Sequence, residues 1–276
     1  MMTLRPPKLV APPGACDTHI HFYDAAAPVA AGAPMPGSRT VAQYRAVQRR
    51  LGLERVVVVQ PNAYADDNRL TLAAIAELGA GARGVGVVRP GVRDDELERL
   101  TRGGLRGLRI MTLNGGTLGF DVMDALMARV HALGWHANVQ LDGRELPRHA
   151  AQLRRLPGRF VIDHTGKFLE PVSLDDPAFA ALLRLVDTGR CWVKVSGPYE
   201  TSRTGAPRYE DVGRLARALI AHAPERILWA SNWPHPSAGA PPSDDADLLD
   251  LLLDWAPAEA TRARILRDNP VELYGY

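Results

Sequence analysis

The feature that most constrains the fold is an alternation along the chain between short apolar runs and longer segments of helical periodicity. This alternation is typical of βαβ units and a parallel sheet, because a parallel connection needs a helix to cross back over the sheet. Several runs are apolar over most of their length, as expected for strands that are covered on both faces. The candidate strands are residues 15–19, 55–60, 84–88, 105–110, 136–141, 160–164, 191–196 and 226–231.

Helical periodicity fills the intervals between these strands. Gly52 and Gly134 end two of the helices, since glycine adopts the left-handed conformation of a helix C-terminus. Eight strands alternating with helices in 276 residues predict one (β/α)8 TIM barrel that spans residues 1–276 as a single domain. A doubly wound open sheet is the alternative, but no glycine-rich dinucleotide turn follows the first strand. The candidate helices are residues 41–51, 70–78, 95–101, 122–133, 144–156, 178–187, 209–223, 244–255 and 258–266.

Composition narrows the class of protein further. Hydrophobic residues make up 46% of the chain, yet no apolar run approaches the roughly 20 residues of a membrane span, so no membrane partner is expected. Cys16 and Cys191 lie in apolar strand-like runs, which favours buried thiols in a reducing compartment and predicts a cytoplasmic protein. The formal net charge is +2, and the arginines fall mostly on predicted helices beside acidic residues. No basic stripe with interleaved aromatics is present, so no nucleic-acid partner is expected.

The first strand ends in the motif Asp-Thr-His-Ile-His at residues 17–21. Side chains alternate between the faces of a strand, so His19 and His21 point to the same face, one pleat apart. At the carboxyl end of a barrel strand we expect that face to point into the active-site pocket. Two imidazoles there can hold a metal, bind an oxyanion or relay a proton. Irregular stretches at 24–38 and 236–243 follow the first and eighth strands, on the face where barrels carry their active sites.

Two later strands also end in polar residues. His164 ends the sixth strand, and its structural alternative is a core histidine bonded to backbone. Lys167 follows the same strand, where a cation can meet an anionic substrate group. The eighth strand runs into Asn232 and then His235, which is either a hydrogen-bond partner at the rim or a pocket group.

Three motifs together resemble the amidohydrolase superfamily: Asp-x-His-x-His at 17–21, Asp-His-x-Gly at 163–166 and Asn-Trp-Pro-His at 232–235. Within it, the chain is similar to the branch that holds 2-pyrone-4,6-dicarboxylate lactonase and D-galactarolactone isomerase. The likeness covers nearly the whole chain and is nearest to the isomerase group, through residues 163–168 and 199–203. The resemblance implies an amidohydrolase-type barrel and lactone chemistry.

Two departures from the metal-dependent members bear on the cofactor. Those members add a histidine on strand five and an aspartate on strand eight, whereas this chain offers Gln140 and Asn232. Zinc is normally held by three or four His, Cys or carboxylate ligands, so two neutral amides leave a poor site. We therefore predict no required metal; the alternative is a single zinc at His19, His21 and His164.

The same asparagine bears on the reaction. In a lactonase of this branch the strand-eight aspartate is the natural base for water, whereas an asparagine amide has no useful basicity. Isomerisation of a lactone needs no water, because a substrate hydroxyl attacks the carbonyl of its own molecule. We expect His19 and His21 to stabilise the oxyanion, His164 to act as general acid and base, and Asn232 to position the hydroxyl. The isomerase group carries glutamine at the position of His19, so identity of substrate is left open.

Cations near the strand ends indicate an anionic substrate. Arg109 ends strand four, and its planar guanidinium can bind a carboxylate through two parallel hydrogen bonds. Arg203 follows strand seven, and each arginine has a structural ion pair as its alternative role. With Lys167 they predict a carboxylated sugar-acid lactone. The remaining substrate-binding candidates are Gln60, Asn62, Gln140 and Tyr199.

The leading hypothesis is metal-independent isomerisation of an aldarolactone by intramolecular acyl transfer. The second is a lactone hydrolase in which a histidine activates water, and the third is a metal-dependent hydrolase or decarboxylase. A barrel retained only for binding would not need the three histidines that this chain carries.

Overall fold

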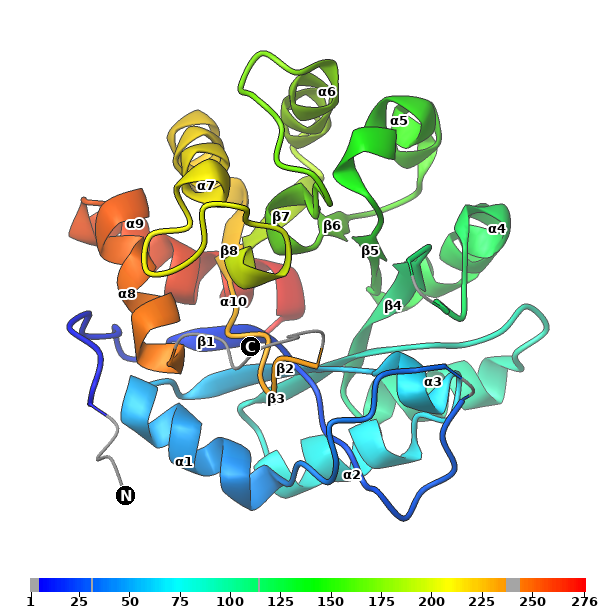
Figure 1. The fold of residues 1–276 in the computed structure, drawn as a ribbon. Coiled ribbons are helices and arrows are strands. Elements are labelled where there is room, and N and C mark those ends of the chain that lie inside the picture. Colours follow the sequence, from blue (N-terminus) through cyan, green and yellow to red (C-terminus); the bar gives the residue numbers. More distant parts are fainter. Residues whose placement is uncertain (1–4, 31, 114, 237–243) are drawn as a thin grey trace.

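The computed structural model describes residues 5–30, 32–113, 115–236 and 244–276, and Figure 1 shows them as a ring of strands surrounded by helices. Eight parallel strands pair in chain order from β1 to β8, which confirms the expected (β/α)8 barrel. The first and last strands contact one another and close the ring. The strands are β1 (Cys16–Ile20), β2 (Arg55–Val59), β3 (Ala82–Gly86), β4 (Leu105–Met111), β5 (His136–Gln140), β6 (Phe160–Ile162), β7 (Cys191–Val195) and β8 (Ile227–Trp229).

All the candidate strands are present, and β3 differs most from its prediction. The apolar run 84–88 predicted a strand that begins and ends two residues too late. Its ladder with β2 begins instead at the pair Val56 and Ala82 and continues to Val59 and Val85. Strand bounds are therefore decided by pairing, which the apolar pattern records only indirectly.

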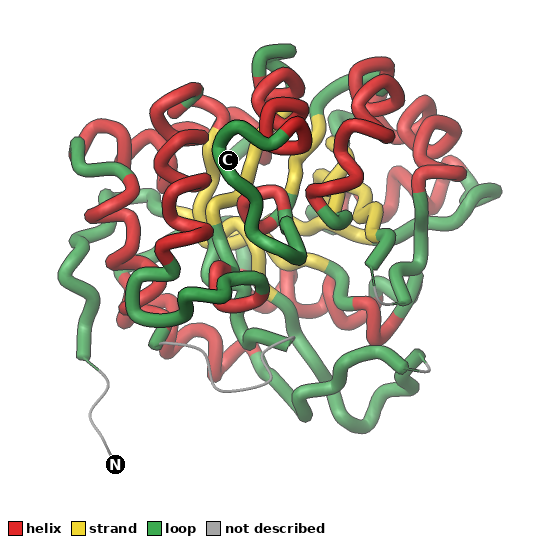
Figure 2. Tube along the Cα trace, turned by 45° about the horizontal axis from the view of Figure 1, so that its top comes forward, coloured by secondary structure: helices red, strands yellow, loops and turns green. Residues whose placement is uncertain are grey.

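The helices form an outer layer around the strands, as Figure 2 shows in red and yellow. All the expected helices are confirmed, with small differences at their ends. The last helix, α10, was not predicted, because its six residues are too few to show a period. The helices are α1 (Val41–Leu51), α2 (Arg69–Leu78), α3 (Asp94–Arg102), α4 (Phe120–Val130), α5 (Leu146–Arg155), α6 (Pro177–Val186), α7 (Glu210–His222), α8 (Asp245–Trp255), α9 (Glu259–Ala263) and α10 (Asn269–Tyr274).

A buried carboxylate joins β1 to the segment after β8. Asp17 accepts hydrogen bonds from Ser231 N at 3.0 Å, from Ser231 Oγ at 2.5 Å and from Tyr44 Oη at 3.1 Å. Burial raises the pKa of Asp17 to about 6, although these hydrogen bonds oppose the shift. The backbone continues the seam, because Asn232 N donates to His19 O at 3.0 Å. The first residue of the Asp-x-His-x-His motif therefore closes the barrel and holds the β1 histidines beside Asn232.

The other expectations about the chain concern its cysteines, its membrane contacts and its loops. Cys16 and Cys191 are buried free thiols, as predicted. Across the described ranges, no helix is long and apolar enough to cross a membrane. Backbone hydrogen bonds between Tyr23 and Arg39 tie together the two ends of the stretch 24–38. Most of the second expected loop, residues 237–243, lies outside the described residues.

One histidine belongs to the barrel interior and not to the site. His136 begins β5 and is buried against β4, where a Cβ added at Gly107 would lie 2.7 Å from its ring. The Tyr274 ring packs edge-on against it, with 5.2 Å between the ring centroids. Burial lowers the pKa of His136 to about 3.

Replacing His136 with leucine should make the stability of the protein less sensitive to acid. The unfolded chain binds a proton at this position near pH 6.5, whereas the folded chain does so only near pH 3. Between these values, each fall of one pH unit therefore removes up to ~1.4 kcal/mol from the free energy of unfolding through this one group. Urea unfolding at several pH values between about 7 and 4.5 should give a shallower dependence for the variant. Equal pH dependences for the two proteins would show that the folded protein binds a proton at His136 as readily as the unfolded chain does.

Candidate active site

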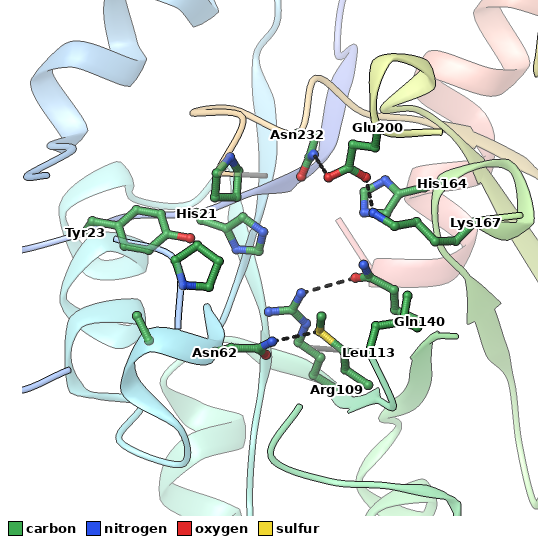
Figure 3. Close-up of a pocket in the computed structure, with 14 residues that line it drawn as sticks. His21, Tyr23, Asn62, Arg109, Leu113, Gln140, His164, Lys167, Glu200 and Asn232 are labelled. Carbon is green, nitrogen blue, oxygen red and sulfur yellow. Dashed lines mark hydrogen bonds and ion pairs between the residues drawn. The ribbon is translucent and has the colours of Figure 1, made fainter. Parts of the chain in front are cut away.

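A cavity of about 230 Å³ opens at the carboxyl ends of the strands (Figure 3). Its walls come from β4 and β5 and from the segments that follow β1, β2, β6, β7 and β8. This is the end of the barrel at which enzymes of this fold carry their active sites. The lining residues are His21, Tyr23, Pro34, Asn62, Ala63, Arg109, Met111, Leu113, Gln140, His164, Lys167, Glu200, Asn232 and Pro236.

The two histidines of the β1 motif take different places. His21 lines the cavity, and its Nδ1 lies 2.7 Å from the carbonyl oxygen of Val59. His19 is fully buried, with its Nε2 3.2 Å from His21 Nε2. Burial lowers the pKa of His21 to about 3 and that of His19 well below its ordinary value. We expected both rings to face the pocket, and this is wrong for His19. Alternation along a strand determines which face a side chain lies on, but its depth in the barrel determines whether it reaches the cavity.

His164 follows β6 and lines the same cavity. Its backbone is left-handed, with φ of 52°, a conformation that non-glycine residues adopt mainly where the surrounding structure holds them. Nδ1 lies 2.9 Å from Ser196 Oγ, and the ring centroid lies 4.9 Å from that of His19. Burial lowers the pKa of His164 to about 4, so the ring is neutral at neutral pH.

Asn232 reaches the cavity from the segment after β8 and is held by a chain of hydrogen bonds. Its Nδ2 donates to Tyr199 Oη at 2.9 Å, and Tyr199 Oη lies 2.8 Å from His235 Nδ1. His235 Nε2 lies 2.9 Å from Asp245 Oδ1. His235 is therefore the hydrogen-bond partner at the rim. Tyr199 is not among the lining residues and supports Asn232, so its expected contact with substrate is not supported.

A buried ion pair occupies one wall of the cavity. Lys167 Nζ donates to Glu200 Oε2, and both side chains are almost entirely buried. Glu200 Oε1 also lies 3.5 Å from Asn232 Nδ2 (Figure 3). Lys167 was expected here, but Glu200 was not. A signal for Glu200 was present, because this carboxylate follows a barrel strand inside the segment 199–203 that carries the family resemblance.

Arg109 lies on β4 and supplies the other cation of the cavity. The side chain is buried, and it donates to Gln60 O and, at 3.3 Å, to Gln140 Oε1. Both acceptors are neutral, and no carboxylate in the described part of the chain forms an ion pair with Arg109. Since Lys167 and Glu200 offset one another, and Arg109 has no ion-pair partner among the described residues, the lining favours an anionic ligand.

Two further candidates lie away from the cavity. The Gln60 amide donates to Ala65 O at 3.2 Å and to Asp67 O at 2.9 Å, so this side chain holds the turn after β2. Arg203 lies at the surface, with 70% of its side chain exposed, and pairs with Glu170. The expectation that both bind substrate is not supported, because local hydrogen bonds use the Gln60 amide and the loop turns Arg203 outward. Asn62 and Gln140 line the cavity as expected.

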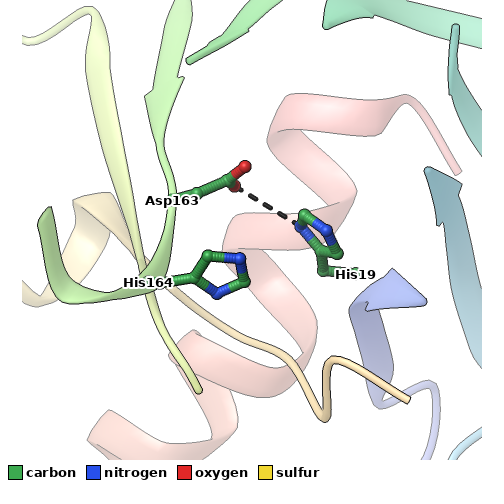
Figure 4. Close-up of side chains that lie close together, drawn as sticks. All are labelled: His19, Asp163 and His164. Carbon is green, nitrogen blue, oxygen red and sulfur yellow. Dashed lines mark ion pairs between the residues drawn. The ribbon is translucent and has the colours of Figure 1, made fainter. Parts of the chain in front are cut away.

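A group that could hold a metal ion lies deeper in the barrel. Ligand atoms of His19, Asp163 and His164 all lie within 4.8 Å of one another (Figure 4). Asp163 takes the place that the sequence assigned to His21 in the alternative zinc site. Lys194 Nζ, however, lies 3.2 Å from His19 Nδ1 and 3.1 Å from Asp163 Oδ1, so an ammonium group already contacts two of the three ligands. Burial alone would raise the pKa of Asp163. The nearby Lys194 and His19 instead hold this pKa well below its usual range.

A closed (β/α)8 barrel with these histidines at its carboxyl end defines an amidohydrolase-type enzyme, and the chain belongs to the amidohydrolase family, which it matches over residues 16–276. It is 42% identical over 271 residues to D-galactarolactone isomerase from Agrobacterium fabrum, an alignment that covers 95% of this chain and 91% of that protein. It is 33% identical over 284 residues to a 2-pyrone-4,6-dicarboxylate hydrolase from Comamonas testosteroni, over 97% of this chain and 92% of the relative. A crystal structure of an Agrobacterium tumefaciens protein in its apo form matches with a TM-score of 0.92 and 41% identity, over 98% of each chain.

Proposed function

We propose that this enzyme isomerises a carboxylated sugar-acid lactone of the D-galactarolactone class by intramolecular acyl transfer. The observation that carries the proposal is the position of Asn232, a neutral amide, in a cavity that also holds His164 and the cation Arg109, whose acceptors are neutral. The relative of 42% identity named D-galactarolactone isomerase supports the same class of reaction.

The proposed reaction moves an acyl group between two oxygens of one molecule. A hydroxyl oxygen of the substrate attacks the lactone carbonyl carbon, and the π electron pair of the carbonyl moves onto its oxygen. When this adduct collapses, the bond from the carbonyl carbon to the original ring oxygen breaks and a ring of different size remains. One proton passes from the attacking hydroxyl to the released oxygen, so no water is consumed. Holding both groups in one molecule supplies a high effective molarity.

His164 is the group we assign to the proton transfer. At neutral pH its ring is neutral, since burial lowers its pKa to about 4, and it therefore has a lone pair that can accept a proton. Because Nδ1 faces Ser196 Oγ, we assign the transfer to Nε2. Asn232 positions the attacking hydroxyl by hydrogen bonds and takes no proton from it.

The negative charge of the adduct requires a donor, and Lys167 is the group we assign to it. Both nitrogens of His21 are already engaged, Nδ1 with Val59 O and Nε2 with His19 Nε2. The two β1 histidines therefore do not take the oxyanion role that we expected. Instead, His21 forms part of the cavity wall, and His19 contacts the cavity only through His21. The Lys167 ammonium lies in the lining and can stabilise a developing oxyanion electrostatically.

The proposed reaction proceeds without a metal ion. Gln140 and Asn232 remain neutral amides, and Lys194 lies against the group of side chains that could otherwise bind zinc. A cytoplasmic location belongs to the same proposal, because the buried free thiols of Cys16 and Cys191 fit a reducing compartment.

Hydrolysis of a lactone is the second candidate function, and Glu200 is the observation that favours it. This carboxylate lines the cavity beside Asn232, where it could accept a proton from water. The hydrolase from Comamonas testosteroni, at 33% identity, supports the same alternative. Glu200 already forms an ion pair with Lys167, which is why we place isomerisation first.

A proton NMR time course on aldarolactones separates these functions. We expect interconversion of lactones of different ring size, with unchanged activity after treatment with a chelator. Appearance of the open-chain diacid as the primary product would assign the enzyme to the hydrolases. Loss of activity on chelation, restored by zinc, would overturn the metal-independent reaction.

Replacing Arg109 with methionine should raise KM for an anionic lactone by about 10- to 100-fold, the value of a charge-assisted hydrogen bond. The effect on kcat should be smaller, because the guanidinium binds the substrate and does not move protons. Arg203→Met is the matched control, since Arg203 is exposed and should leave KM unchanged. A KM that is the same in the wild type and the Arg109 variant would remove this residue from substrate binding.

Replacing Asn232 with aspartate should convert part of the isomerase activity into hydrolysis. A carboxylate at this position can accept a proton from water, and we expect isomerisation to fall at least ~10-fold while ring opening rises. Asn62→Asp places the same charge on the Arg109 side of the cavity, where its amide contacts Met111 Sδ, and should weaken substrate binding without producing hydrolysis. If Asn232→Ala alters neither reaction, Asn232 does not position the hydroxyl.

A further inference from the structure

Lys194 is a fully buried lysine at the centre of the barrel. It interrupts the apolar strand β7, and its three ammonium hydrogens have three acceptors nearby. Nζ lies 2.7 Å from Asn138 Oδ1, 3.1 Å from Asp163 Oδ1 and 3.2 Å from His19 Nδ1. Asn138 in turn donates to the second oxygen of Asp163 at 2.7 Å. An unpaired ammonium in the interior is costly, so a buried lysine is tolerated only where it has partners. The three acceptors around Lys194 therefore indicate that the fold accommodates this charge specifically.

The hydrogen bonds that begin at Lys194 have a single consistent direction. An ammonium group only donates, so His19 Nδ1 must accept and His19 Nε2 must carry the proton. His19 Nε2 then donates to His21 Nε2 at 3.2 Å, which leaves the His21 proton on Nδ1. The other end of the chain requires the same result, since Val59 O only accepts and lies 2.7 Å from His21 Nδ1.

The same ammonium lies beside the position at which a metal would have to bind. His19 Nδ1 and Asp163 Oδ1 are 3.5 Å apart and face one another (Figure 4), and Lys194 Nζ lies beside both. An ion about 2.1 Å from each of these two atoms, as zinc requires, would lie at most about 3.8 Å from Nζ. A divalent cation and an ammonium group at that distance repel strongly in a buried site.

We propose that Lys194 is a fixed internal cation that replaces a metal ion in this site. It closes the group of His19, Asp163 and His164 to divalent metals, and it donates to His19 Nδ1 in the tautomer that Val59 O also requires. Lys194 is thus a positioning residue, because it acts on the cavity only through His19 and His21. The inference does not depend on which lactone is the substrate.

Removing the ammonium should open a metal site that the wild type lacks. In Lys194→Ala, zinc should bind one ion per chain with an affinity at least ~100-fold above that of the wild type, because the like charge is gone and the three ligands remain. Zinc content after dialysis and cobalt absorption spectra measure this directly. The double variant Lys194→Ala/Asp163→Asn lacks the carboxylate ligand and should lose the gain. Equal zinc affinity in the wild type and in Lys194→Ala would overturn the proposal.

A second measurement needs no substitution and therefore does not depend on a variant that folds. Nitrogen NMR of the wild-type protein labelled at histidine should show His19 protonated on Nε2 and His21 on Nδ1. In Lys194→Gln, which keeps hydrogen-bond donors but removes the charge, both tautomers should be kept, because Val59 O still fixes them, while the nitrogen shift of His19 Nδ1 should move. The opposite tautomers in the wild type would overturn the assignment. Neither measurement uses catalytic activity, so failure here is distinct from failure of the proposed reaction.

Discussion

The seam that joins β1 to the segment after β8 is the interaction on which the whole site depends. Without it, the two strands would be open edges and the carboxyl ends of the barrel would not face a common space. Asp17 accepts two hydrogen bonds from Ser231, a residue 214 positions away, and Asn232 N donates to His19 O. The backbone bond that closes the barrel therefore also fixes the β1 histidines relative to Asn232.

Of three buried cations in and below the cavity, two are paired with carboxylates and the third has neutral acceptors, and this difference divides the site. Lys194 has a carboxylate, Asp163, and serves the interior. Lys167 pairs with Glu200 at the cavity wall. Arg109 has only neutral acceptors among the described residues, so a ligand that brings its own carboxylate gains most there. Because an unpaired charge in a dry interior is costly, we expect the arrangement of counter-charges to orient the proposed anionic lactone toward Arg109.

The position of a residue after a strand did not by itself decide whether its side chain reaches the cavity. Gln60 was expected to bind substrate because it ends β2, but its amide is used by the turn that follows. Arg203 follows β7 as expected, yet the loop turns it toward Glu170 and solvent. Glu200, three positions earlier, lies in the cavity instead. A position after a strand predicts nearness to the barrel mouth, whereas the loop conformation decides which side chain enters it.

The sequence by itself determined the eight strands in order, the helices between them and the end of the barrel at which His21, His164 and Asn232 would meet. It could do so because apolar periodicity and the direction of parallel strands are local properties that propagate along the chain. Only the tertiary structure decided that His19 lies below the cavity and that Lys194 contacts it. Depth in a barrel and the pairing of buried charges depend on contacts between strands far apart in the chain, and no local pattern records them.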